Sequence, residues 1–77
     1  MLAENVDTKI GVIISISDLN VKVLLENNSV KINDILYTNF NGEERTFEVV
    51  KIDDMIATTI PFESVIGLKK GIDLYED

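Results

Sequence analysis

The sequence has 77 residues, of which 45% are hydrophobic, a net charge of −7, and neither cysteine nor histidine. A chain of this length predicts one domain around one modest hydrophobic core. Lacking these two residue types, the chain has no disulfide, no thiolate, and neither the commonest metal ligand nor the commonest general base. Scattered lysines and a single arginine, Arg45, also argue against unaided nucleic-acid binding.

The sequence also argues against direct contact with a membrane. Its longest apolar runs, residues 12–14 and 23–25, are far too short to span a bilayer. Residues 1–9 are polar and acidic, unlike a signal peptide. We therefore expect a cytoplasmic protein, with residues 1–8 as an N-terminal extension and residues 9–77 as the folded domain.

The first predicted strand covers residues 11–17, which are dense in β-branched side chains. Its apolar residues recur with a period of two, which is typical of a strand. Val12, Ile14 and Ile16 share one face, so Ile13 is an apolar exception on the outward face.

The second predicted strand, residues 21–26, follows a short turn that contains Asp and Asn. Val21, Val23 and Leu25 face inward, which leaves Leu24 on the outward face. So short a connection predicts an antiparallel hairpin with the first strand.

Asn41-Gly42 is the sharpest turn signal, because both residues accept the positive φ that a tight hairpin requires. It connects predicted strands at residues 35–40 and 46–52, and residues 43–44 lengthen the loop. Phe47 and Val49 are expected to face inward.

A fifth predicted strand, residues 55–60, ends at Pro61, which has no N–H to give to a ladder. A glycine-containing loop then leads to a short last strand at residues 72–75. Five or six short strands, with no helix long enough to cover a sheet, predict an all-β fold: a small closed antiparallel β-barrel.

No set of residues points to catalysis. The segment GLKKG at residues 67–71 lacks the spacing and the Ser or Thr of a phosphate-binding loop, so Lys69-Lys70 is interpreted as a solvated turn. The acidic pairs at residues 43–44, 53–54 and 76–77 lack the ligand pattern of a calcium loop and are also assigned to solvated turns. No histidine activates a serine. The tyrosines and phenylalanines are expected in the core rather than on a base-stacking platform. We expect no enzyme activity, cofactor, metal or small-molecule ligand in this domain.

The order of segments resembles the N-terminal β-barrel domain of the α/β family of hexameric rotary ATPases, most closely a β-type ATP synthase subunit. KIGVIISI at residues 9–16 and VKV at 21–23 are similar to that family's first hairpin, INDILY at 32–37 to its third strand, and FEVV at 47–50 to the strand that follows. The most specific part is the close TTIPFESVIGLKKGIDL at residues 58–74.

The resemblance implies a six-stranded barrel of Greek-key type that holds a ring of ATPase subunits together and contains none of the family's ATP-contacting residues. Neighbouring ATPase subunits are then the expected partners, and the chain is either part of a longer ATPase or a free-standing relative. Ile13 and Leu24, left outward after the core is assigned, are the candidate subunit interface.

Three alternatives stay open. Flagellar and type III export ATPases share this barrel, and HerA-type DNA translocases have a related one. A free-standing acidic barrel that binds a basic peptide belongs to a different functional class.

Overall fold

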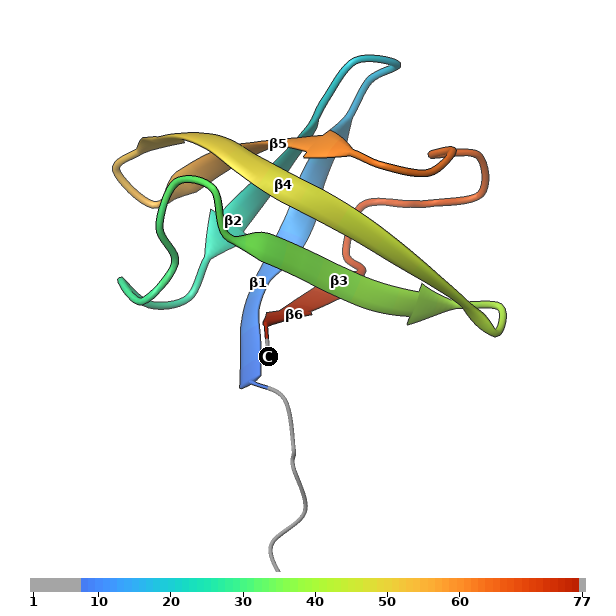
Figure 1. Cartoon of the computed structure of the whole chain (residues 1–77), viewed down its shortest axis with the longest axis horizontal. Helices are drawn as coiled ribbons and strands as arrows, with labels where there is room; N and C mark the ends of the chain where they lie inside the picture. Colours follow the sequence, from blue (N-terminus) through green and yellow to red (C-terminus); the bar gives the residue numbers. More distant parts are fainter. Residues whose placement is uncertain (1–7, 77) are drawn as a thin grey trace, which may run out of the picture.

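β-branched and aliphatic residues, separated by Asn, Asp and Gly turns, form six strands in the computed structural model, which describes residues 8–76 (Figure 1). The strands are β1 (Thr8–Ile16), β2 (Val21–Leu25), β3 (Ile35–Phe40), β4 (Glu43–Asp53), β5 (Ile56–Pro61) and β6 (Asp73–Glu76). The predicted extension at residues 1–8 lies outside the described residues apart from Thr8, which opens β1.

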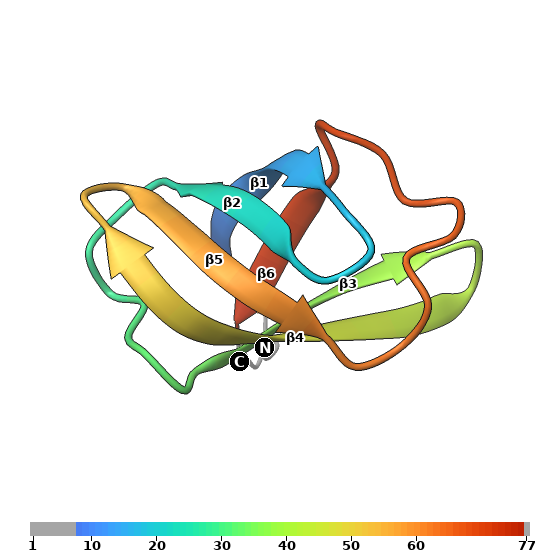
Figure 2. The same cartoon turned by 90° about the horizontal axis from the view of Figure 1, so that it is seen from above.

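The strands close into a barrel in the order β1-β2-β5-β4-β3-β6, and every neighbouring pair is antiparallel (Figure 2). Strands β3, β4 and β5 follow one another as hairpins, and β2 lies beside β5 rather than β3, which is a Greek-key connection. The predicted closed six-stranded antiparallel barrel is confirmed.

The core follows the period-two pattern most clearly in β2, where Val21, Val23 and Leu25 are buried and Lys22 and Leu24 are exposed. Inside the barrel, Thr59 Oγ1 donates a 2.9 Å hydrogen bond to the Val21 carbonyl, so its buried hydroxyl is satisfied. The buried hydrophobic residues are Ile10, Ile13, Val21, Val23, Leu25, Val30, Leu36, Phe47, Val49, Ala57, Leu68 and Leu74.

Strand β1 departs from a regular alternation, and the predicted outward position of Ile13 is wrong. Its pairing shifts between Lys9 and Gly11 against β6, and between Ile13 and Ser15 against β2. Each shift adds one residue to β1, so Ile10, Ile13 and Ile16 face the core at intervals of three. Ile13 is 1% exposed and has no side-chain surface to offer a partner.

The hairpin between β3 and β4 is as tight as predicted. Asn41 and Gly42 have φ values of 55° and 80°, and Phe40 pairs with Glu43 on either side of them. Glu43 and Glu44 therefore lie in β4, which corrects their assignment to the loop.

A second acidic pair was also misplaced. Glu76 ends β6 rather than lying in a turn, and Asp77 lies outside the described residues. The predicted turn at residues 53–54 is correct for Asp54, which has a φ of 61° in the β4–β5 turn, whereas Asp53 is the last residue of β4.

Gly11 provides a test of how closely β1 packs on β2. A Cβ atom at this position would lie 2.5 Å from the Leu24 carbonyl oxygen and 2.8 Å from Val23 Cγ1. We expect Gly11→Ala to lower the free energy of unfolding by about 1–3 kcal/mol, and the melting temperature by roughly 4–8 °C for each kcal/mol. Exposed Ser15, changed to Ala in the same strand, should shift stability by no more than about 0.5 kcal/mol. Equal melting temperatures for Gly11→Ala and the unchanged chain would contradict this packing.

Candidate functional site

Leu24 faces solvent as predicted and is 44% exposed. It pairs with Val12 of β1 on one side and with Ile56 of β5 on the other. Outward positions of a solitary barrel strand are usually polar. A row of three aliphatic side chains across three strands therefore marks this side of the barrel as a candidate interaction surface.

Further outward apolar residues lie on β5, β4 and β3, beyond the row formed by Lys22, Thr58 and Lys51. Ile60 of β5 and Ile35 of β3 both pair with Glu48 of β4, one on each side. Val50 is the extra residue where the β4–β5 register shifts, and it also points outward. We call this surface the apolar outer face; it comprises Leu24, Ile35, Val50, Ile56 and Ile60, each between 39% and 44% exposed.

Two lysines lie within the apolar outer face. Thr58 of β5 pairs with Lys22 of β2 and with Lys51 of β4, so one cation flanks it on each side. Glu48, which is half-buried, and Asp53, which pairs with Ile56, are the carboxylates of this face. The surface therefore combines aliphatic area with two lysines and two carboxylates, in a chain whose net charge is −7.

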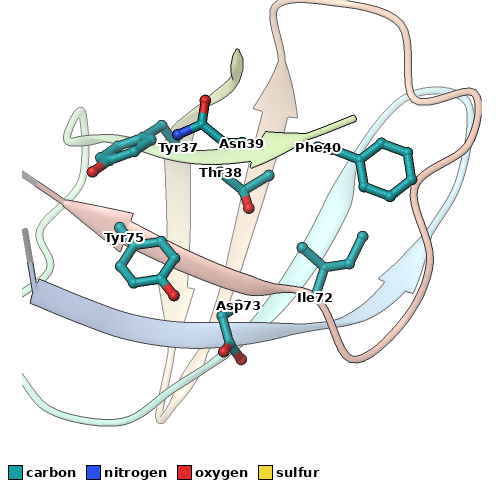
Figure 3. Close-up of a pocket in the computed structure, with 7 residues that line it drawn as sticks. All are labelled: Tyr37, Thr38, Asn39, Phe40, Ile72, Asp73 and Tyr75. Carbon is teal, nitrogen blue, oxygen red and sulfur yellow. The ribbon is translucent and has the colours of Figure 1, made fainter. Parts of the chain in front are cut away.

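The barrel closes between β3 and β6 through one backbone pair, Tyr37 with Tyr75. Their ring centroids lie 5.9 Å apart with the planes at 37°. Beside this short pairing lies a groove of about 590 Å³ (Figure 3). We call it the seam groove; its lining residues are Tyr37, Thr38, Asn39, Phe40, Ile72, Asp73 and Tyr75.

The groove corrects the expectation that the aromatic residues fill the core. Phe47 alone among them is fully buried in residues 8–76. Tyr37, Phe40 and Tyr75 are half-buried along the groove, and Phe62 is 56% exposed.

Carboxylates surround the closing pair. Lys9 Nζ forms an ion pair with Asp73 in the groove, at 3.3 Å, and a second ion pair with Glu26, at 3.2 Å. Hydrogen bonds to Glu26 and then Asp73 raise the pKa of Lys9. Lys9 is thus shared between two carboxylates on the groove side of the barrel.

Asp34, just before β3, and Glu76, at the end of β6, share a hydrogen bond across the same seam. Burial, and then the hydrogen bond to Asp34 and its charge, raise the pKa of Glu76 to about 7. The hydrogen bond from Glu76, and then that from the Lys31 backbone N–H at 2.8 Å, lower the pKa of Asp34. The shared proton therefore resides on Glu76, since Asp34 has the additional donor that favours its ionised form.

The connection from β5 to β6 is held against the barrel at both ends. Near its start, the Thr46 N–H donates to Glu63 Oε1 at 2.6 Å, and Arg45 Nη1 donates to the Ser64 carbonyl. At its end, the Gly71 N–H donates to the Ile13 carbonyl at 2.8 Å. The connection and the β3–β4 hairpin lie at the same end of the barrel (Figure 2).

The path of this connection requires glycine at both ends of the GLKKG segment. Gly67 and Gly71 have φ values of 91° and 92°, which other residues rarely adopt. A Cβ at Gly67 would also lie 3.1 Å from the Phe40 ring. Lys69 and Lys70 are exposed in the turn between them, as predicted.

Within residues 8–76, no group of three or more acidic side chains lies where it could hold a metal ion. The same range contains no helix long and apolar enough to cross a membrane.

The Asp34–Glu76 pair predicts a dependence of stability on pH. A raised pKa in the folded state favours the protonated form, so the contribution of Glu76 is full below about pH 4.5 and declines as the pH rises through about 7. We expect the melting temperature to fall between pH 5.5 and pH 8 by more in the unchanged chain than in Glu76→Gln. The chain has no histidine to titrate in this window. Glu44→Gln, at an exposed carboxylate, is the control. Parallel pH profiles for all three chains would refute the assignment.

Comparison with solved structures finds similarity to the assembled ATPase EscN from the type III secretion system of enteropathogenic E. coli. The two chains are 30% identical with a TM-score of 0.72, and the match covers 87% of this chain and 15% of EscN. No protein-family model matches the sequence, and no curated protein does so either. The predicted resemblance to the N-terminal barrel of the hexameric ATPases is confirmed by this match in both sequence and fold.

Proposed function

We propose that this barrel is a non-catalytic assembly module, which holds neighbouring subunits of an export-type ATPase together in a ring. The observation that carries the proposal is the similarity to the assembled ATPase EscN, because it joins 30% identity to a shared barrel fold over 87% of the chain. The chain spans about 15% of the length of EscN. The ATPase activity of a parent protein, its cytoplasmic location and its ring partners are parts of the proposal.

Among the family branches considered, the match favours an export ATPase over a β-type ATP synthase subunit or a DNA translocase. EscN belongs to a type III secretion system, and the similarity reaches beyond fold to 30% of the aligned residues. Fold alone would not favour one function over another, because one barrel can serve many.

The surface chemistry supports assembly rather than catalysis. The apolar outer face offers five partly exposed aliphatic side chains on adjacent strands. A fold of this size, with no disulfide, gains stability when such a surface is covered by a neighbour.

The proposal predicts that the 77-residue chain associates with itself. Sedimentation velocity and native mass spectrometry over a concentration series should show reversible oligomers that grow with concentration. We expect the association to be weak, since a ring is also held by its other domains. A chain that stays strictly monomeric up to about 1 mM, where an interaction of about 4 kcal/mol would be half-populated, would refute the proposal.

The proposal also predicts that this chain neither binds nor hydrolyses ATP. Phosphate binding requires a cradle of backbone N–H groups, and in GLKKG the Gly71 N–H is already bonded to the Ile13 carbonyl. Titration with Mg-ATP should therefore leave the backbone amide shifts unchanged. Saturable shifts at residues 67–71, lost in a chain with Lys69→Ala and Lys70→Ala, would show a nucleotide site instead.

A further inference from the structure

The seam between β3 and β6 has the least backbone pairing in the barrel. Within residues 8–76 the two strands share one register pair, Tyr37 with Tyr75 (Figure 3). On their other edges, β3 pairs with β4 over Ile35–Phe40, and β6 pairs with β1 over Asp73–Glu76. Local opening begins where the fewest hydrogen bonds hold neighbouring strands, so this seam is where the barrel opens most easily.

A pair of carboxyl groups spans the seam. Asp34 directly precedes β3, Glu76 ends β6, and a hydrogen bond joins their side chains. One of the two must be protonated to donate this bond, because two carboxylates have no hydrogen to share and repel each other. The same pair therefore closes the seam in one protonation state and opposes its closure in the other.

The groups around Glu76 on β1 and β6 do not compensate its charge. Its register partner on β1, Thr8, is uncharged. The lysine of β1, Lys9, is engaged in its own ion pairs. The other titratable residues of β6, Asp73 and Tyr75, lie on the face of the strand opposite to Glu76.

On the side of β3, Lys31 is the cation that acts on the pair. Its backbone N–H donates to Asp34 at 2.8 Å, which keeps the negative charge on Asp34 and the proton on Glu76. Burial is the first cause that raises the pKa of Glu76, followed by Asp34, and together they outweigh Lys31 and raise it to about 7. The next residue along β3, Ile35, has no charge.

We propose that the β3–β6 seam is a proton-dependent latch, closed while a protonated Glu76 donates to Asp34 and locally open when both are ionised. Strand β6 stays on β1 in the open form, because the fully buried Leu74 and the backbone pairs with β1 hold it there. Opening separates Tyr37 from Tyr75 and so enlarges the seam groove, which both residues line. The inference goes beyond the assembly function and does not depend on it.

NMR spectroscopy of the 77-residue chain between pH 5.5 and pH 8.5 tests the latch, and no histidine titrates in this window. The side-chain carbon shift of Glu76 reports its ionisation, which we expect as the pH rises through about 7. The nuclear Overhauser effect (NOE) between the Tyr37 and Tyr75 rings, whose centroids lie 5.9 Å apart, reports whether the seam is closed. It should fall about twofold or more with the same midpoint, as a latch open in half of the molecules requires. The backbone NOEs between Lys9 and Tyr75 should stay constant, since β6 remains on β1.

Two variants separate the carboxyl pair from other effects of pH. Glu76→Gln keeps the size of the side chain and has an amide N–H that can donate to Asp34 at every pH. Its Tyr37–Tyr75 NOE should therefore keep the intensity seen at pH 5.5 throughout the titration. Glu44→Gln, at an exposed carboxylate of β4, is the matched control and should follow the unchanged chain.

Three results would overturn the latch. The first is a Tyr37–Tyr75 NOE that stays constant while Glu76 loses its proton, or that falls in Glu76→Gln as it does in the unchanged chain. The second is a Glu76 carboxyl that is already ionised at pH 5.5. The third is loss of the Lys9–Tyr75 NOEs together with the ring contact, because the barrel then unfolds as a whole instead of opening at one seam.

Discussion

Closure of this barrel depends on the bending of β1, which must pair with β2 along one edge and with β6 along the other. Its two extra residues bend the strand and increase its twist, as bulges do in small barrels. Gly11 lies between them, where β1 and β2 approach so closely that a Cβ would overlap the Leu24 carbonyl. Ile13 of the same strand accepts a backbone hydrogen bond from the Gly71 N–H and donates one to the Ile72 carbonyl. Strand β1 therefore also fixes where the β5–β6 connection ends and β6 begins.

The late start of β6 explains the character of the seam. Only Asp73–Glu76 remain to pair with β3, and one register pair forms. Side chains rather than a backbone ladder then line the rest of the junction. Tyr37, Phe40 and Tyr75 cover it while remaining half-buried, and the hydrogen bond between Asp34 and Glu76 joins two carboxyl groups at its end. A groove beside a short seam is thus a consequence of strand lengths.

Much of this architecture could be predicted from the sequence, because its physical signals are local. The alternation of Val21, Val23 and Leu25 fixes the faces of β2, and the positive φ that Asn41 and Gly42 tolerate fixes the β3–β4 hairpin. The register of β1 could not be predicted in this way. Bulges depend on how two neighbouring strands meet, so the period of the sequence placed Ile13 outward although it is buried.

Of the five residues of the apolar outer face, only Leu24 was predicted from the sequence to lie at an interface. Leu24 stands out because the other residues of its strand alternate cleanly, whereas the inward residues of β5 are Ala57 and Thr59. Small or polar inward residues give no apolar period, so Ile56 and Ile60 resemble core residues in the sequence. These small side chains share the barrel interior with Phe47, the largest of the fully buried side chains.

The charge distribution decides which role electrostatics can have in assembly. Every copy carries a net charge of −7, so copies repel one another. At ordinary ionic strength, salt screens this repulsion beyond about 8–10 Å. Burial of aliphatic surface does not depend on this charge, so it can stabilise the proposed assembly despite the repulsion. On the apolar outer face, Lys22 and Lys51 are balanced by Glu48 and Asp53, so this face carries little of the repulsive net charge. In the proposed assembly the apolar surface is therefore the source of affinity, and the balanced charges of the outer face do not oppose it.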